Sequence, residues 1–201
     1  MSPITTRMSD DDDRFDPTDR SQYDLVRAAN VIVPLSPIRK ARICGVLAIL
    51  GALAAPIVAT LPAAVREVGF SGPPAATPLG VAVVVLVGTV AAGGGGLGLV
   101  ALQRRLARGP EPSDADVWTF IAAEDALTGI GFVTGGLGVG VGLSLLASGH
   151  RGVETLEALH RNGVEPYLAV STLPVTPRLT SAVAVAIGLA VLAATVAVDR
   201  E

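Results

Sequence analysis

Four long apolar blocks, none of which contains Asp, Glu, Lys, Arg or His, constrain this chain more than any other feature of its sequence. Each block is close to the ~20 residues that a helix needs to cross a ~30 Å hydrocarbon layer. Lipid offers no hydrogen-bond partner to a backbone, so each block must satisfy its own N–H and C=O groups as a helix. We therefore predict an all-α membrane protein with a bundle of four transmembrane helices. The predicted spans are about 43–65, 79–102, 126–147 and 180–198.

The composition agrees with a membrane protein. Hydrophobic residues make up 50% of the 201 residues, only 16% are charged, and the mean hydropathy is +0.57. A net charge of −3 argues against nucleic acid as a partner, because phosphate binding needs a basic surface. The single cysteine, Cys44, excludes an intrachain disulfide. The Asp-rich, lysine-poor usage resembles that of halophilic proteins, with a GC-rich genome as the alternative explanation.

Residues 1–38 are predicted to form an acidic, disordered tail, since their composition cannot bury enough apolar surface to fold. A short surface helix over 18–33 is expected within this tail. The tail lacks the apolar core of a signal peptide, and translation could begin at Met1 or at Met8. The remainder, 39–201, forms the predicted transmembrane domain.

Helix-start signals precede each span. A hydroxyl N-cap followed by proline occurs three times, at Ser36-Pro37, Thr77-Pro78 and Thr176-Pro177. The stretch from Ser113 to Asp116 offers a capping box for the third helix. The two Thr-Pro pairs also raise the alternative of a duplicated helical hairpin, although convergent capping is the favoured explanation.

Basic residues around the spans predict the orientation. Seven lie on one side and four on the other, which favours both termini in the cytoplasm of a cell-membrane protein with several spans. The first group is Arg39, Lys40, Arg42, Arg104, Arg105, Arg108 and Arg200; the second is Arg66, Arg151, Arg161 and Arg178.

Glycines spaced four apart predict close helix packing between the second and third spans, because small residues let two helices approach each other in lipid. The same faces could instead form the seam of a homo-oligomer. The residues predicted to pack are Gly88, Ala92, Gly96, Gly131, Gly135, Gly138 and Gly142. Pro56, near the middle of the first span, is predicted to kink that helix.

Glu124 and Asp125 form the best candidate for a charged site. The third helix is expected to begin at Asp114, so these carboxylates lie near the membrane edge on the face toward the protein. We expect them to form an interfacial charge cluster with Arg104 and Arg105. The alternative is that they bind a cation or accept a proton.

The second outer loop is predicted to carry a short extracytoplasmic helix at 153–161. Glu154, Glu157 and His160, with His150 nearby, have some metal-ligating character, but their spacing spreads them over ~120° of the helix, so we predict no metal site. Gly93, Gly95 and Gly98 match GxGxxG inside an apolar span, without the strand that a dinucleotide site requires. No catalytic residue and no cofactor is predicted.

These observations favour an uncharacterised, non-enzymatic membrane protein that acts as a scaffold or assembly component. Its expected partners are the lipid bilayer, other membrane proteins or a second copy of the chain. The alternative is a small transporter or channel for a neutral or hydrophobic solute. An enzyme using Glu124 and Asp125 at the membrane edge is the third hypothesis.

Overall fold

A computed structural model of the chain describes residues 26–27, 29–109, 112–170, 172–198 and 200. Within these residues it contains four helical stretches long and apolar enough to cross a membrane. The predicted bundle of four transmembrane helices is therefore confirmed, and the chain is a membrane protein. The acidic stretch 10–19 and most of the predicted surface helix lie outside the described residues, although 26, 27, 29 and 30 are helical.

The first span begins earlier and ends earlier than predicted. It runs through α2 (Pro37–Leu50), the 3-10 turn η2 (Gly51–Leu53) and α3 (Ala54–Ala59). The Ser36 hydroxyl caps α2 by accepting a hydrogen bond from the Arg39 N–H at 3.3 Å. The predicted end at 65 is wrong because Pro62 interrupts the helix, and α4 (Ala63–Gly69) follows as a separate short helix.

The second span is the single long helix α5 (Gly80–Arg108). The predicted start at Thr77-Pro78 is wrong, because Thr77 terminates the 3-10 turn η3 (Pro74–Ala76). Leu79 instead forms an isolated antiparallel bridge with Ala169, which keeps the backbone extended until Gly80.

The third helix begins at Asp114, as predicted, continues past the predicted end of the span at 147, and changes its helical type. It consists of α6 (Asp114–Thr128), the π-helical segment η4 (Gly129–Gly135), α7 (Gly136–Ala147) and the 3-10 turn η5 (Ser148–Arg151). Ser113 caps α6 by accepting from the Asp116 N–H at 3.4 Å, as predicted.

The outer helix and the fourth span match the sequence prediction closely. Helix α8 covers Val153–Arg161, and α9 covers Pro177–Val198. The Thr176 hydroxyl accepts from the Leu179 N–H at 3.2 Å, so this Thr-Pro pair does start a helix.

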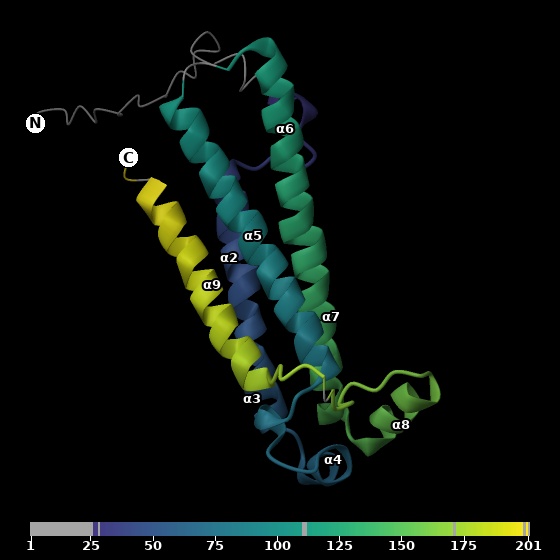
Figure 1. Cartoon of the computed structure of the whole chain (residues 1–201). Helices are drawn as coiled ribbons and strands as arrows, with labels where there is room; N and C mark the ends of the chain where they lie inside the picture. The colour runs from purple at the N-terminus through teal and green to yellow at the C-terminus, as the bar shows by residue number, and fades with distance from the viewer. Residues whose placement is uncertain (1–25, 28, 110–111, 171, 199, 201) are drawn as a thin grey trace, which may run out of the picture.

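Helix α5 lies at the centre of the arrangement, where it packs against α2, α9 and the third span. Figure 1 shows the four spans side by side, with α4 and α8 at the end away from the C-terminus. We call this the loop end, and the opposite end, where α2 begins and α9 finishes, the terminal end.

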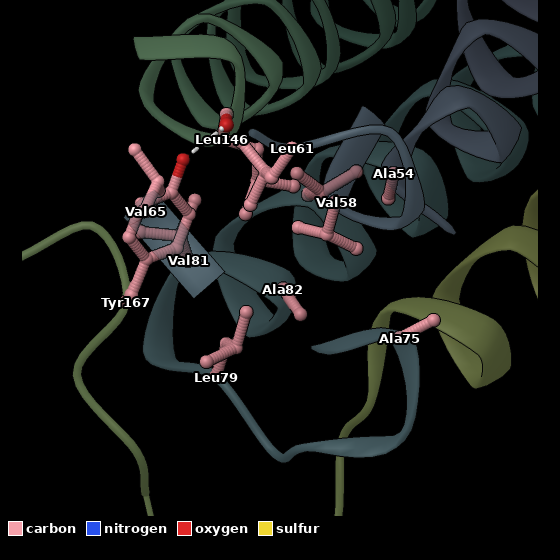
Figure 2. Close-up of a cluster of buried hydrophobic side chains, with 11 residues drawn as sticks. Ala54, Val58, Leu61, Val65, Ala75, Leu79, Val81, Ala82, Leu146 and Tyr167 are labelled. Carbon is pink, nitrogen blue, oxygen red and sulfur yellow. Dashed lines mark hydrogen bonds between the residues drawn. The ribbon is translucent and has the colours of Figure 1, made fainter. Parts of the chain in front are cut away.

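A cluster of buried apolar side chains fills the loop end (Figure 2). Leu61, Val65, Leu79 and Leu146 come from four separate segments, and each is at most 2% exposed. Tyr167 joins the cluster with its ring and donates its hydroxyl to the Leu146 carbonyl at 2.6 Å. This core fixes the loops between the spans to the bundle.

Candidate functional site

Glu124 is a carboxylate with no exposed surface, buried inside a helix bundle whose core is mostly apolar. It lies near the C-terminal end of α6 and next to the first turn of α2, which begins at the terminal end of the bundle. The hydroxyl of Thr128, one turn later, donates to the Glu124 carbonyl at 2.7 Å. The Thr128 hydroxyl and the Glu124 carbonyl therefore satisfy each other's hydrogen bonding inside the protein, as lipid surroundings require.

Two cations converge on the Glu124 carboxylate. Lys40 Nζ lies 2.7 Å from Oε1, and the Lys40 side chain is also fully buried. Arg27 binds both oxygens, with Nη2 at 2.7 Å from Oε1 and Nε at 2.7 Å from Oε2, and its side chain is 15% exposed. We call Arg27, Lys40 and Glu124 the charge cluster.

The positions of the two cations follow from local structure. Lys40 lies in the first turn of α2, and its N–H donates to the Ser36 carbonyl at 3.0 Å. Arg27 precedes α2 in a short helical stretch, and its Nη2 also donates to the Leu35 carbonyl. The Ile32 N–H donates to Asp125 Oδ1 at 3.3 Å, which holds the same segment against α6 a second time.

The charge cluster is stable only when all three of its charged side chains are present. Removing charges from water costs several kcal/mol per ion, and only close, well-oriented pairing offsets that cost. A bidentate guanidinium–carboxylate pair is the strongest such geometry. The cluster therefore joins three parts of the chain, namely the segment around Arg27, the start of α2 and α6, in one arrangement.

The structure places other groups on the two carboxylates than the expected Arg104 and Arg105. Glu124 pairs with Arg27 and Lys40, and Asp125 accepts from the Ile32 N–H. Arg105 lies over the Phe120 ring, 5.5 Å from its centroid, and Arg104 Nε is buried without a hydrogen-bond partner in the described part of the chain. Sequence reasoning missed Lys40 because it placed the first span at 43, although Ser36-Pro37 already signalled the earlier start.

The glycines of the second and third spans meet at backbone distance. A Cβ atom added to Gly138 would lie 2.7 Å from Gly88 Cα, and one added to Gly135 would lie 2.8 Å from the Ala92 backbone nitrogen. Gly131 faces Gly95 and Cys44, and Gly142 faces Val85. Gly96 differs from the others, because it faces Val191 of α9 and Cys44 of α2 rather than the third span.

Pro56 removes one backbone hydrogen bond from the first span, and a side chain of α9 supplies a replacement. Proline has no N–H for the carbonyl four residues earlier, which is that of Ala52. The Ser181 hydroxyl of α9 donates to this carbonyl at 2.7 Å and accepts from the Ala55 N–H at 2.9 Å. Ser181 is a residue that sequence reasoning missed, because no local pattern links it to Ala52, 129 residues earlier.

The remaining residues that the sequence analysis considered make packing or hydrogen-bond contacts within the chain. Gly93, Gly95 and Gly98 lie inside α5 against Ile187, Gly131 and Leu127, which is helix packing. At the loop end, His160 Nδ1 lies 3.0 Å from Glu165, and His150 Nε2 lies 3.2 Å from the Thr60 hydroxyl. No group of three or more His, Cys, Asp or Glu suited to a metal ion occurs in the described ranges.

No protein-family model matches the chain, and no curated protein or solved structure matches it significantly.

Proposed function

We propose that this protein is a non-enzymatic membrane scaffold, a rigid four-helix platform that assembles with other membrane proteins or with a second copy of itself. The observation that carries the proposal is the backbone contact between α5 and the third span. Gly88 and Gly138 leave no room between these helices even for an added methyl group. A solute path along this seam would require the two helices to separate.

The charge cluster supports the same proposal. An ion-coupled carrier exposes its membrane carboxylate to water or substrate at some stage. Glu124 instead has both oxygens bonded to cations of the same chain. A carboxylate held in this way orders the terminal end of the bundle rather than reacting.

The proposed platform sits in the cell membrane with both termini in the cytoplasm. The first helix begins and the last helix finishes at the same end of the bundle (Figure 1). Arg39, Lys40 and Arg42 at this end, with the arginines that follow α5, supply the positive charge expected of cytoplasmic loops.

Most of the glycines predicted to pack are already in contact with other helices of the same chain. A partner would therefore have to bind to other surfaces. Gly94 and Gly140 differ, since a Cβ added to either meets no other atom within 4 Å. Val90, Val133 and Leu137 are more than half exposed on the same outward surfaces of α5 and the third span. These apolar outer surfaces face lipid or a partner's helices.

A small transporter for a neutral solute is the second candidate function. The π-helical segment η4 and the 3-10 turn η2 before Pro56 favour it, because such departures from the regular α-helix are often found at functional sites.

Two experiments on the purified, full-length chain separate these functions. Cross-linking in native membranes is expected to give a partner or dimer band, and vesicles containing only this chain are expected to take up glycerol no faster than protein-free vesicles. Glycerol uptake above the protein-free rate, without any cross-linked band, would overturn the scaffold in favour of the transporter.

A further inference from the structure

A groove of ≈ 720 Å³ lies between α4 and α8 at the loop end of the bundle. This volume is within the range of ~300–1,000 Å³ that small-molecule sites usually have. Its walls are formed by α4, α8 and the loop that follows α8. Its larger apolar lining residues include Val68, Val153, Leu156, Val164, Tyr167 and Leu168.

The walls of the groove are fixed by contacts within the chain. The Tyr167 hydroxyl donates to Leu146 and accepts from the Gly149 N–H at 3.1 Å, and its ring packs on Phe70 with centroids 5.0 Å apart. The Leu168 carbonyl accepts from the Gly80 N–H at 3.2 Å, which ties the loop to the start of α5. The groove therefore exists before anything binds in it.

The rim of the groove carries no excess of positive charge. Glu157 and Glu165 provide two carboxylates, Arg161 provides one guanidinium, and His160 provides an imidazole. His160 lies 3.0 Å from Glu165. This rim has no excess of positive charge to hold a phosphate or a free carboxylate, so an occupant must enter by an uncharged part.

The backbone of the loop wall disfavours a polypeptide occupant. A bound peptide would bring N–H and C=O groups that need partners in an apolar site. The N–H of Leu168 is already bonded to Glu165, and the N–H of Val164 to Leu159. An acyl chain has no such groups and needs only apolar surface.

The groove also lies next to the ends of two membrane-spanning helices. Val153 is two residues beyond the last residue of the third span, and Ala169 forms its bridge with Leu79, next to the first residue of α5. Val68 and Leu168 at the lips are 72% and 56% exposed. We propose that this groove binds one acyl chain of a bilayer phospholipid, independently of the scaffold function.

The test uses phosphatidylcholine that carries a photoreactive diazirine on its acyl chain. Vesicles containing this lipid and the full-length protein are transferred to mild detergent, illuminated and digested, and adducts are located by mass spectrometry. We expect adducts on the groove peptides at about tenfold the level on the lipid-facing peptide around Val133, which corresponds to ~1.4 kcal/mol of preference. Equal labelling of the two peptides would overturn the proposal.

Two groove-filling variants and one matched control sharpen the result. A Cβ added to Gly69 meets only Tyr167 at 3.5 Å, so Gly69→Leu enters the groove without displacing its wall. Val68→Trp fills it from the exposed lip. Gly72→Leu is the control, because a Cβ there meets nothing within 4 Å and the residue does not line the groove. Both filling variants are expected to lose the groove adducts, and the control is expected to retain them. Adducts that persist in a correctly folded filling variant would contradict the proposal.

A further arm tests the absence of a positive excess on the rim and the nature of the occupant. Diazirine-labelled phosphatidylglycerol is expected to label the groove as well as phosphatidylcholine does. A strong preference for the anionic lipid, or a protein in the groove in place of lipid, would contradict the assignment.

Discussion

Glu124 is a single carboxylate that binds two cations from different parts of the chain. Arg27 reaches it from the segment before α2, and Lys40 from the first turn of α2. Exposed ion pairs contribute little to stability, but removing one partner of a buried pair leaves an uncompensated charge. The stability of the terminal end is therefore concentrated in this residue.

Glu124→Gln is expected to lower the free energy of unfolding by ~3 kcal/mol or more, because it leaves Lys40 and Arg27 without their common counter-charge. Denaturant titration of the purified protein in mixed micelles measures this change. Asp125→Asn is the matched control, since an amide oxygen still accepts the Ile32 N–H. A Glu124→Gln variant as stable as Asp125→Asn would show that the charge cluster does not hold the terminal end together.

Tyr167 fixes the loop end in a comparable way, through its hydroxyl rather than through charge. Tyr167→Phe is expected to cost ~1–3 kcal/mol of stability, because the Leu146 carbonyl and the Gly149 N–H lose a buried partner. Thermal unfolding in detergent measures the cost, and a change below the error of that measurement would contradict the assigned role.

Tyr167 is also expected to make the stability of the protein depend on pH. Burial raises the pKa of Tyr167 above its usual value, more than the hydrogen bonds from Gly149 and Ser148 lower it. The folded protein then holds the phenolic proton more tightly than the unfolded chain does. Stability should be fully present below the ordinary tyrosine pKa of ~10 and fall as the pH rises above it. Tyr167→Phe should reduce this alkaline fall, and an unchanged slope would contradict the prediction.

Among the helices, the contact between α5 and the third span depends on positions that admit only glycine. Gly138→Ala should destabilise the bundle by ~1–3 kcal/mol, because its methyl group would overlap the Gly88 backbone. Gly140→Ala, two residues further along the same helix, should be neutral, because nothing lies within 4 Å of the added atom. Unfolding titrations of the two variants form a matched pair, and equal losses would show that the seam is elsewhere.

The carbonyl that Pro56 leaves without a partner in the first span is bonded by a residue of the fourth span. Ser181→Ala should cost ~1 kcal/mol, because the Ala52 carbonyl and the Ala55 N–H lose their shared hydroxyl. In a Pro56→Ala background residue 56 regains an N–H that can bond Ala52, so the cost of Ser181→Ala should shrink. A double-mutant cycle measures this coupling, and strictly additive losses would contradict it.

Across the chain, the sequence predicts those features that depend on local patterns. Four apolar blocks predict four helices, and apolar spacing predicts α8 with the bounds that the structure has. Capping chemistry placed α6 and α9 correctly, because Ser113 and Thr176 bond within their own first turns.

Features that depend on contacts between distant segments could not be predicted in this way. Thr77 has the same local pattern as Thr176, but the bridge between Leu79 and Ala169 delays the start of α5. Lys40 and Glu124 are 84 residues apart, so no spacing rule links them, and their burial depends on how α2 lies against α6. The π segment at Gly129–Gly135 likewise arises where glycines of the third span meet α5.

Cysteine accessibility in sealed membrane vesicles decides whether lipid surrounds this bundle. The experiment uses a Cys44→Ala background. In it, Ser113→Cys marks the terminal end and Gly72→Cys marks the loop end. Val133→Cys marks the outer face of the third span, where the Val133 side chain is 59% exposed on the protein surface. A membrane-impermeant maleimide should label Ser113→Cys and Gly72→Cys from opposite sides and leave Val133→Cys unlabelled from both. Ready labelling of Val133→Cys in water, or labelling of both ends from one side, would contradict a bundle that crosses the bilayer.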